Sequence, residues 1–173
     1  MTILPWTHAI ADMPSSGRDY TRQASPEECA ALSADLGLLA CQDVSAAYTI
    51  RAIGGGRYRL TGTVEAHVTQ SCVVTLEPLK SHVKLPIDVT FSPDTSAAPP
   101  ALEDGDIEVS TLPEVEPIEN SALDTGRVVF EALATGIDPY PKKADAAFAW
   151  NDPRATDSSI NPFAVLAKLK SKT

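Results

Sequence analysis

The sequence predicts an α+β domain built on an antiparallel sheet, and three observations support this fold class. Two stretches of the chain alternate apolar and polar residues with the period of two that is typical of half-buried strands. Other stretches begin with helix-capping signals and continue with apolar residues at helical spacing. A third kind of segment is rich in proline and acidic residues. We therefore expect an antiparallel β meander or a partly open barrel, with two or three short helices and a long acidic linker.

The first expected elements are a short strand and a helix. Residues 2–10 alternate larger and smaller side chains, so this stretch is expected to pair as an edge strand. Ser25 is placed to cap free amide groups, Pro26 suits the first helical turn, and Glu28 completes a capping box. The helix is expected to run from this cap to about Leu36, just before a glycine that ends it.

The clearest signal is a pair of strands between residues 57 and 91. In the first strand, apolar residues hold the even positions, apart from a glycine at 62; they are Tyr58, Leu60, Val64, Ala66 and Val68. In the second strand, the apolar face holds Val83, Leu85, Ile87, Val89 and Phe91. Pro86 on the outward face predicts a sheet edge or a bulge, because proline has no amide hydrogen to donate. Upstream, residues 48–53 lead into three glycines at 54–56, which suit a hairpin connection.

The charge of the chain is concentrated in one window. The chain carries 14 Lys+Arg and 23 Asp+Glu, for a net charge of -9, and residues 94–126 hold nine acidic residues with no Lys or Arg. The remainder is balanced, 14 acids to 14 bases. With its prolines, the segment 94–120 is expected to act as an acidic linker or insertion, with a short strand near residues 107–112. It attracts basic proteins or serves only as a solubilising linker; composition leaves both open.

Two helices are expected after the acidic segment. Ser121 and Asp124 form a second capping-box pattern, and the apolar residues Val129, Phe130 and Leu133 follow at helical spacing. Near the C-terminus, residues 160–173 begin with another cap and continue as a narrow apolar stripe with lysines. So short a helix is marginal alone in water, so it is expected to dock on this domain or on a partner.

Several classes of protein are excluded by what the sequence lacks. No apolar run approaches the length that spans a bilayer, and the N-terminus has no signal-peptide pattern, so a cytoplasmic location is expected. Cys29, Cys41 and Cys72 form no C-x-x-C pair, which argues against a disulfide framework and a zinc site. We expect no metal and no cofactor, because the three histidines lack ligand spacing and no phosphate-binding loop is present.

Two hypotheses give the exposed polar residues a chemical function, and the alternative is that they are ordinary surface residues. A thiol hydrolase would use Cys72 with His67 or His82, but strand alternation places both histidines on the solvent face. A direct RNA binder would use Arg51, Arg57 and Arg59, together with Arg18, Arg22 and the lysine tail. No aromatic residue shares the arginine face as a stacking platform would require, so a solvated sheet face is the alternative.

Four short motifs resemble those of the YceD-like family, specifically its alphaproteobacterial branch. They are Gln70-Ser71-Cys72-Val73-Val74-Thr75-Leu76-Glu77-Pro78 within residues 62–93, Leu123-Asp124-Thr125-Gly126 leading to Glu131, Asp138-Pro139-Tyr140-Pro141-Lys142-Lys143, and Asn161-Pro162-Phe163-Ala164-Val165-Leu166. The resemblance runs from about Ser25 to the C-terminus. It implies that residues 1–173 form a single YceD-like domain.

The resemblance implies a role in the accumulation of large-subunit ribosomal RNA, in a family with no established enzymatic reaction. It points to binding residues at Cys72, Thr75, Glu77, Pro78, Asp124, Gly126, Glu131, Asn161, Pro162 and Phe163. Many members have a second cysteine where this chain has Thr75, which puts metal or disulfide chemistry at that turn in doubt. Thr125 and Arg127 also depart from the family's helix motif, which implies altered local contacts rather than another fold.

Taken together, the sequence favours a non-enzymatic factor in large-subunit ribosome biogenesis. The expected partners are a ribosomal protein or a precursor of the large subunit, with ribosomal RNA as a further candidate. No membrane partner and no small-molecule substrate are expected. The alternative is a direct RNA-binding protein that uses the face of Arg51, Arg57 and Arg59 and the lysine tail.

Overall fold

The computed structural model describes residues 3–14, 16–93 and 114–148. The chain divides into two units, residues 1–143 and residues 144–173, and every described helix and strand belongs to the first. The short strand expected near residues 107–112 and the helix expected over 160–173 lie outside the described residues. The same is true of Asn161, Pro162 and Phe163.

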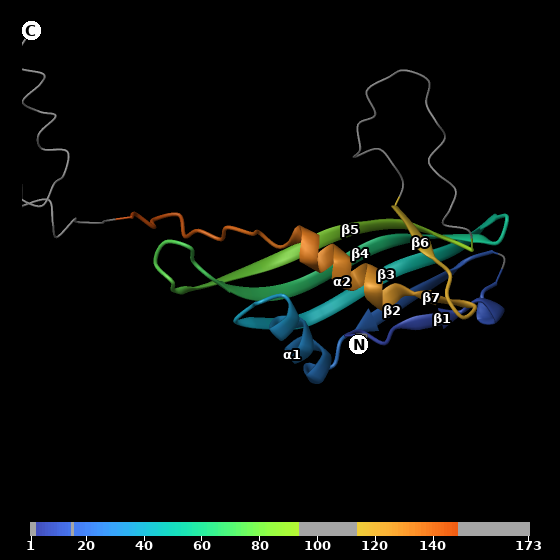
Figure 1. Ribbon diagram of the computed structural model, residues 1–173, viewed down its shortest axis with the longest axis horizontal. Coiled ribbons are helices and arrows are strands. Elements are labelled where there is room, and N and C mark those ends of the chain that lie inside the picture. Colours follow the sequence, from blue (N-terminus) through green and yellow to red (C-terminus); the bar gives the residue numbers. More distant parts are fainter. Residues whose placement is uncertain (1–2, 15, 94–113, 149–173) are drawn as a thin grey trace, which may run out of the picture. The chain divides into compact units, whose positions relative to one another are not determined.

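A five-stranded sheet forms the body of the first unit, in the order β2-β3-β4-β5-β6 (Figure 1). Its strands are β2 Arg18–Gln23, β3 Ala40–Gly54, β4 Arg57–Ser71, β5 Pro78–Ser92 and β6 Glu114–Pro117. The first four are consecutive and antiparallel; β3, β4 and β5 contain the strands predicted from residues 48–53 and 57–91, whereas β2 was not predicted. The strand β6 is parallel to β5, so the sheet is mixed rather than a pure meander. Its outermost strands β2 and β6 do not pair, so the described residues close no barrel.

The parallel strand could not be anticipated from the sequence. A parallel neighbour needs a long connection, because the chain must return to the end of the sheet where the previous strand began. Residues 93–113 provide that length between β5 and β6. Pro86 faces away from the core on β5, beyond the four residues that β6 covers, so the predicted sheet edge at Pro86 is confirmed.

A second, two-stranded sheet pairs the N-terminal region with the segment before α2. β1 Thr7–Ala9 runs antiparallel to β7 Ala122–Asp124. The strand predicted within residues 2–10 therefore exists, but its partner lies more than 110 residues away and is not part of the main sheet. A short 3-10 turn, Ile10–Asp12, follows β1.

The two described helices differ in how well the sequence located their starts. Helix α1, Pro26–Asp35, has the predicted capping box between Ser25 and Glu28. Helix α2, Thr125–Gly136, is capped by Asp124, whose side chain accepts from the Arg127 amide. The predicted cap at Ser121 is wrong, because residues 122–124 pair as a strand and the helix begins only after them.

Both helices cover one face of the sheet, and the core lies between this face and the helices (Figure 1). The even positions of β4 are buried as predicted, with Leu60, Val64, Ala66 and Val68 at 1% exposure or less. Cys29 and Leu32 of α1 and Val128, Val129 and Leu133 of α2 join the same core cluster. The opposite face of the sheet is polar. Among the described residues, neither helix has the length and apolar character needed to span a bilayer.

Candidate functional site

The predicted binding residues that the structure describes fall into three separate regions of the first unit. Arg51, Arg57 and Arg59 lie on the outer face of the sheet, and Cys72, Thr75, Glu77 and Pro78 lie at the β4–β5 turn. Asp124, Gly126 and Glu131 lie at the start of α2.

The arginine group is divided by the sheet. Arg51 and Arg59 are directly opposite each other on β3 and β4, exposed on the face away from the helices. Arg57, two positions before Arg59, shares that face. Arg18 and Arg22 are paired in register with Ile50 and Ala46, which are buried on the helix side, so they lie on the other face.

One arginine on the outer face is already engaged. The Arg59 guanidinium donates from Nε and Nη2 to the two carboxylate oxygens of Asp88, at 2.8 and 2.6 Å. This forked bond raises the pKa of Arg59 and lowers the pKa of Asp88. Within the described residues, Arg51 and Arg57 have no such partner, so both are available to a ligand, as is Lys80 on the same face.

The two histidines near Cys72 in the sequence are on the outer face, as predicted. His67 and His82 are cross-strand neighbours with ring centroids 4.8 Å apart, and both are exposed. Their nitrogens approach carboxylates rather than the thiol: His67 Nδ1 lies 3.5 Å from Asp43 and His82 Nε2 lies 3.8 Å from Glu65. The part of the chain that the structure describes holds no cluster of three or more metal-ligating side chains.

The connection between β4 and β5 is a hydrogen-bonded loop, which we call the Cys72 turn (residues 71–78). The Cys72 amide donates to the Glu77 carbonyl and the Leu76 amide donates to the Cys72 carbonyl, both at 2.9 Å. Ser71 Oγ donates to the Leu76 carbonyl. Leu76 has a positive φ of 59° that closes the loop, and Pro78 begins β5. The turn is therefore built by its own polar groups.

The Cys72 thiol lies at the centre of this turn. It has no exposed surface, yet it is outside the hydrophobic core cluster. The Thr75 hydroxyl, followed by the backbone amides of Lys143, Thr75 and Val74, lowers the pKa of Cys72 to about 6. Thr75, at the place of the family's second cysteine, thus contributes most to lowering this pKa, and its hydroxyl also lies 3.4 Å from a Glu77 carboxylate oxygen. No histidine is among these neighbours, so the structure does not bring the predicted hydrolase pair together.

A segment from beyond α2 lies against the Cys72 turn. The Val73 amide donates to the Pro141 carbonyl at 2.9 Å, and Gln70 donates to the Asp138 carbonyl at 2.8 Å. Lys143 Nζ pairs with Glu77 at 2.6 Å and lowers the pKa of that carboxyl. Two sequence motifs more than 60 residues apart therefore form one structure.

The combined structure presents large apolar side chains to solvent. Val73, Leu76 and Tyr140 are 50%, 77% and 76% exposed. Their backbone is held by the hydrogen bonds described above, so the exposure belongs to a defined surface rather than to a loose loop. Isolated exposed apolar residues are common on proteins, so this exposure does not by itself define a binding site.

The start of α2 closes against the N-terminal segment, at what we call the N-terminal junction (Trp6, Tyr48, Thr125 and Gly126). The Gly126 amide donates to the Trp6 carbonyl at 2.9 Å, and Thr125 Oγ1 donates to the same carbonyl at 2.8 Å. A Cβ atom on Gly126 would collide with the Leu4 carbonyl. Glycine is required here by close backbone approach, which gives this residue of the motif a structural role.

A buried hydrogen-bond chain continues from the junction into the sheet. His8 Nε2 lies 2.8 Å from the Tyr48 hydroxyl, which lies 3.2 Å from Thr125 Oγ1. Since Thr125 donates its only hydrogen to the Trp6 carbonyl, Tyr48 must donate to Thr125 and His8 must donate to Tyr48. Burial, followed by the positive charges of Arg22 and Arg18, lowers the pKa of His8, and burial raises the pKa of Tyr48. Sequence reasoning missed this chain, because its members are 40 and 77 residues apart.

Glu131 takes part in an ion-pair network on the outside of α2. Arg127 Nε lies 2.8 Å from Glu131 and 3.4 Å from Glu116 of β6. The two carboxylates raise the pKa of Arg127. Arg127, one of the departures from the family's helix motif, therefore connects α2 to the parallel edge strand.

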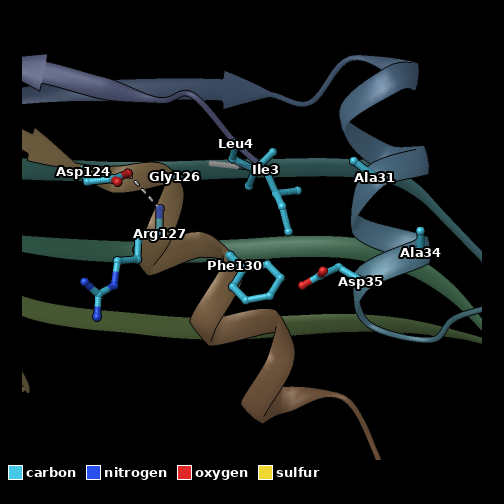
Figure 2. A pocket seen from close by; sticks show the side chains of 9 residues that line it. All are labelled: Ile3, Leu4, Ala31, Ala34, Asp35, Asp124, Gly126, Arg127 and Phe130. Carbon is cyan, nitrogen blue, oxygen red and sulfur yellow. Dashed lines mark hydrogen bonds between the residues drawn. The ribbon is translucent and has the colours of Figure 1, made fainter. Parts of the chain in front are cut away.

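A groove lies between the two helices, beside the N-terminal junction (Figure 2). Its volume is about 840 Å³. The lining residues come from the N-terminal segment, from α1 and from the start of α2; they are Ile3, Leu4, Ala31, Ala34, Asp35, Asp124, Gly126, Arg127 and Phe130. Only Asp124 and Gly126 of this set were predicted as binding residues. The small exposed alanines opposite Cys29 and Leu32 on α1 were the one sequence signal for an open helix face.

Comparison with known proteins gives one match. A model of the family described as Large ribosomal RNA subunit accumulation protein YceD matches residues 60–170. No curated protein and no solved structure matches the chain. The matched range includes the Cys72 turn and α2, and it begins after α1 and β3.

Proposed function

The chain belongs to the YceD family, and from this premise we propose that it is a non-enzymatic factor in large-subunit ribosome biogenesis. The family is named for the accumulation of large ribosomal RNA. In this proposal the protein acts in the cytoplasm, and it supports that accumulation through contacts with a ribosomal protein or with a precursor of the large subunit. The family match is the observation that carries the proposal.

The geometry of the motif residues supports binding rather than catalysis. Among the described residues, the groups that shift the pKa of Cys72 are hydrogen-bond donors and none is a histidine, and the thiol is buried, whereas nucleophilic catalysis requires a base in reach and an open path for substrate. Gly126 and Thr125 serve backbone packing. Two surfaces near these motifs are available to a partner: the exposed apolar residues of the Cys72 turn and the groove between the helices.

The direct test measures ribosomal RNA in cells. Removing the gene should lower the ratio of large-subunit to small-subunit RNA, and the full chain supplied in trans should restore it. In the same cells, the protein should sediment with large-subunit precursors. An unchanged RNA ratio together with sedimentation only as free protein would overturn the proposal.

The acidic segment is part of the proposed contact. We propose that it faces basic protein surface, since the window 94–126 supplies the whole net charge of -9. Deleting residues 94–120 would also remove β6, so the sharper experiment replaces Asp94, Glu103, Asp104, Asp106 and Glu108 by their amides. Co-purification with ribosomal proteins should weaken and should become less salt-dependent. Unchanged co-purification would remove the acidic contact from the proposal.

A second candidate, direct RNA binding, is favoured by one observation. Arg51 and Arg57 are exposed on one flat sheet face, which suits phosphate contacts. If this face binds RNA, Arg51→Gln with Arg57→Gln should reduce the slope of affinity against salt by about two phosphate contacts. Arg18→Gln, on the opposite face, is the matched control. Equal slopes for all three proteins would exclude the arginine face.

A further inference from the structure

The groove between α1 and α2 has an apolar floor that is open to solvent. Ile3 and Phe130 are partly exposed, Ala31 and Ala34 are exposed, and Leu4 is buried beneath them. Figure 2 shows the side chains of Ile3 and Phe130 directed into the space between the two helices. The walls are helices of 10 and 12 residues, so the groove matches the length of a short peptide segment of about three helical turns.

One charge faces the centre of this groove without a partner. Asp35 is the last residue of α1, and Figure 2 shows its carboxylate directed toward Phe130. It has no hydrogen bond or ion pair within the described residues. The last turn of α1 has no basic residue, and a carboxylate is disfavoured at the negative end of a helix. Asp35 is therefore placed where a cation from outside would be stabilised.

The other charges of the groove are already used within the chain. Arg127 is directed away from the centre in Figure 2 and is paired with Glu131 and Glu116. The Asp124 carboxylate caps α2 through the Arg127 amide. The Asp35 carboxylate, next to apolar surface, is therefore the charge in the groove that a ligand would need to complement.

We propose that this groove binds a short basic, amphipathic segment of a partner protein. Apolar side chains of the segment pack on Ile3 and Phe130, and a lysine or arginine pairs with Asp35. The lining carries Asp35 and Asp124 against Arg127, which is already paired, so charge complementarity favours a basic protein segment over RNA or the same face of a second copy. The inference rests on the proposed function only in expecting that the partner is a ribosomal protein.

The first experiment identifies the occupant in cells. A photo-cross-linking amino acid replaces Ala34, which is exposed in the groove, in the full chain; Thr61, exposed on the outer sheet face, carries it in the control. The expected product joins position 34, and not position 61, to a lysine- or arginine-rich segment of an identified ribosomal protein. A cross-link from position 34 to RNA, to a second copy or within the chain would overturn the proposal.

The second experiment separates binding from folding. Ala34→Lys and Asp35→Lys both place a cation at the negative end of α1, which should leave the free energy of unfolding unchanged or slightly higher. Both should weaken binding of a synthetic leucine–lysine amphipathic peptide, measured by fluorescence anisotropy with the full chain. Asp35→Asn should weaken it about two- to fivefold. Thr61→Lys, on the outer sheet face, adds the same single charge as Ala34→Lys, and it should not change the affinity.

A charge swap completes the test. A peptide with glutamate in place of its lysines should bind Asp35→Lys more tightly than it binds the unaltered chain. Equal affinity of the lysine peptide for Asp35→Lys, Thr61→Lys and the unaltered chain would overturn the groove as its site. Peptide affinity and the ribosomal RNA ratio are measured separately, so failure of the groove and failure of the proposed function are distinguishable.

Discussion

The N-terminal junction and the Cys72 turn are both built from sequence motifs and backbone hydrogen bonds, but they lie at different depths. At the junction, Thr125 and Gly126 bond to the Trp6 carbonyl beside fully buried Leu4 and Leu123. At the turn, hydrogen-bond donors surround the Cys72 sulfur at the far end of the β4–β5 hairpin, outside the core.

The difference teaches what each motif determines. In the core, neighbouring backbone leaves no room for another atom, so substitutions there should change the free energy of unfolding strongly. In the turn, there is little packing to lose, so the hydrogen bonds mainly determine the protonation of one thiol and the direction of exposed side chains.

The largest effect is expected from Gly126→Ala. The new methyl group would collide with the Leu4 carbonyl, which is backbone and cannot rotate away, so the free energy of unfolding should fall by about 3 kcal/mol. Gly136→Ala in the same helix is the control, because the added atom meets only the flexible end of the Leu85 side chain. Urea denaturation should separate the two variants. Equal midpoints would contradict the close approach at the junction.

A smaller loss is expected from Tyr48→Phe. Removing the hydroxyl leaves the buried His8 donor without its acceptor, which costs about 1–3 kcal/mol. Tyr20→Phe is the matched control: its hydroxyl donates only a long 3.6 Å bond to Met13 sulfur, so the loss should be below about 0.5 kcal/mol. Equal losses in thermal or urea unfolding would show that the buried chain has no special weight.

At the Cys72 turn, the expected effect depends on pH. The folded pKa of Cys72, about 6, lies below its ordinary value of 9.0, so the folded state binds fewer protons between these values. Stability from this group should therefore rise from about pH 6 to about pH 9, and be lost as the pH falls through 6. The difference between the unfolding curves of the unaltered chain and Cys72→Ala, measured across this range, isolates the effect.

The source of the shift can be tested in the same way. Thr75→Val should raise the midpoint of thiolate formation, followed by ultraviolet absorbance, whereas Thr75→Ser retains the hydroxyl and should restore it. Cys41 is an internal reference, since burial raises its pKa to about 11. Identical midpoints for Thr75→Val and Thr75→Ser would mean that the hydroxyl is not the cause.

The smallest effect is a gain in stability from Leu76→Asn. Leu76 has a φ of 59° and is 77% exposed, so replacing it by a residue that tolerates the left-handed region should stabilise the fold by about 1 kcal/mol. Leu39→Asn, at an exposed position with ordinary φ, should give no gain. If Leu76→Asn is more stable but no longer co-sediments with ribosomal particles, the exposed leucine contributes to binding. Equal stability of Leu76→Asn and Leu39→Asn would contradict backbone strain at Leu76.

Local patterns predicted β4, β5 and one helix well, but they missed β2, β6 and β7. The alternation of Leu60, Val64 and Val68 needed no tertiary information, because a period of two puts one set of side chains on one face. The capping box at Ser25 involves only residues three positions apart. The cap of α2 was misplaced, because pairing of β7 with β1 overrode the local signal at Ser121.

For the candidate site, the residue pattern was enough to identify the motifs and the family to which the chain belongs. The roles of the motif residues depend on the folded structure. It enclosed Cys72 with donors from Thr75 and Lys143, separated Arg51 from Arg18, and left Asp35 facing an open groove. Strand and helix signals depend on neighbours a few residues apart, whereas these environments depend on tertiary contacts: Lys143 lies 66 residues from Glu77 in the chain, and the groove joins α1 to α2.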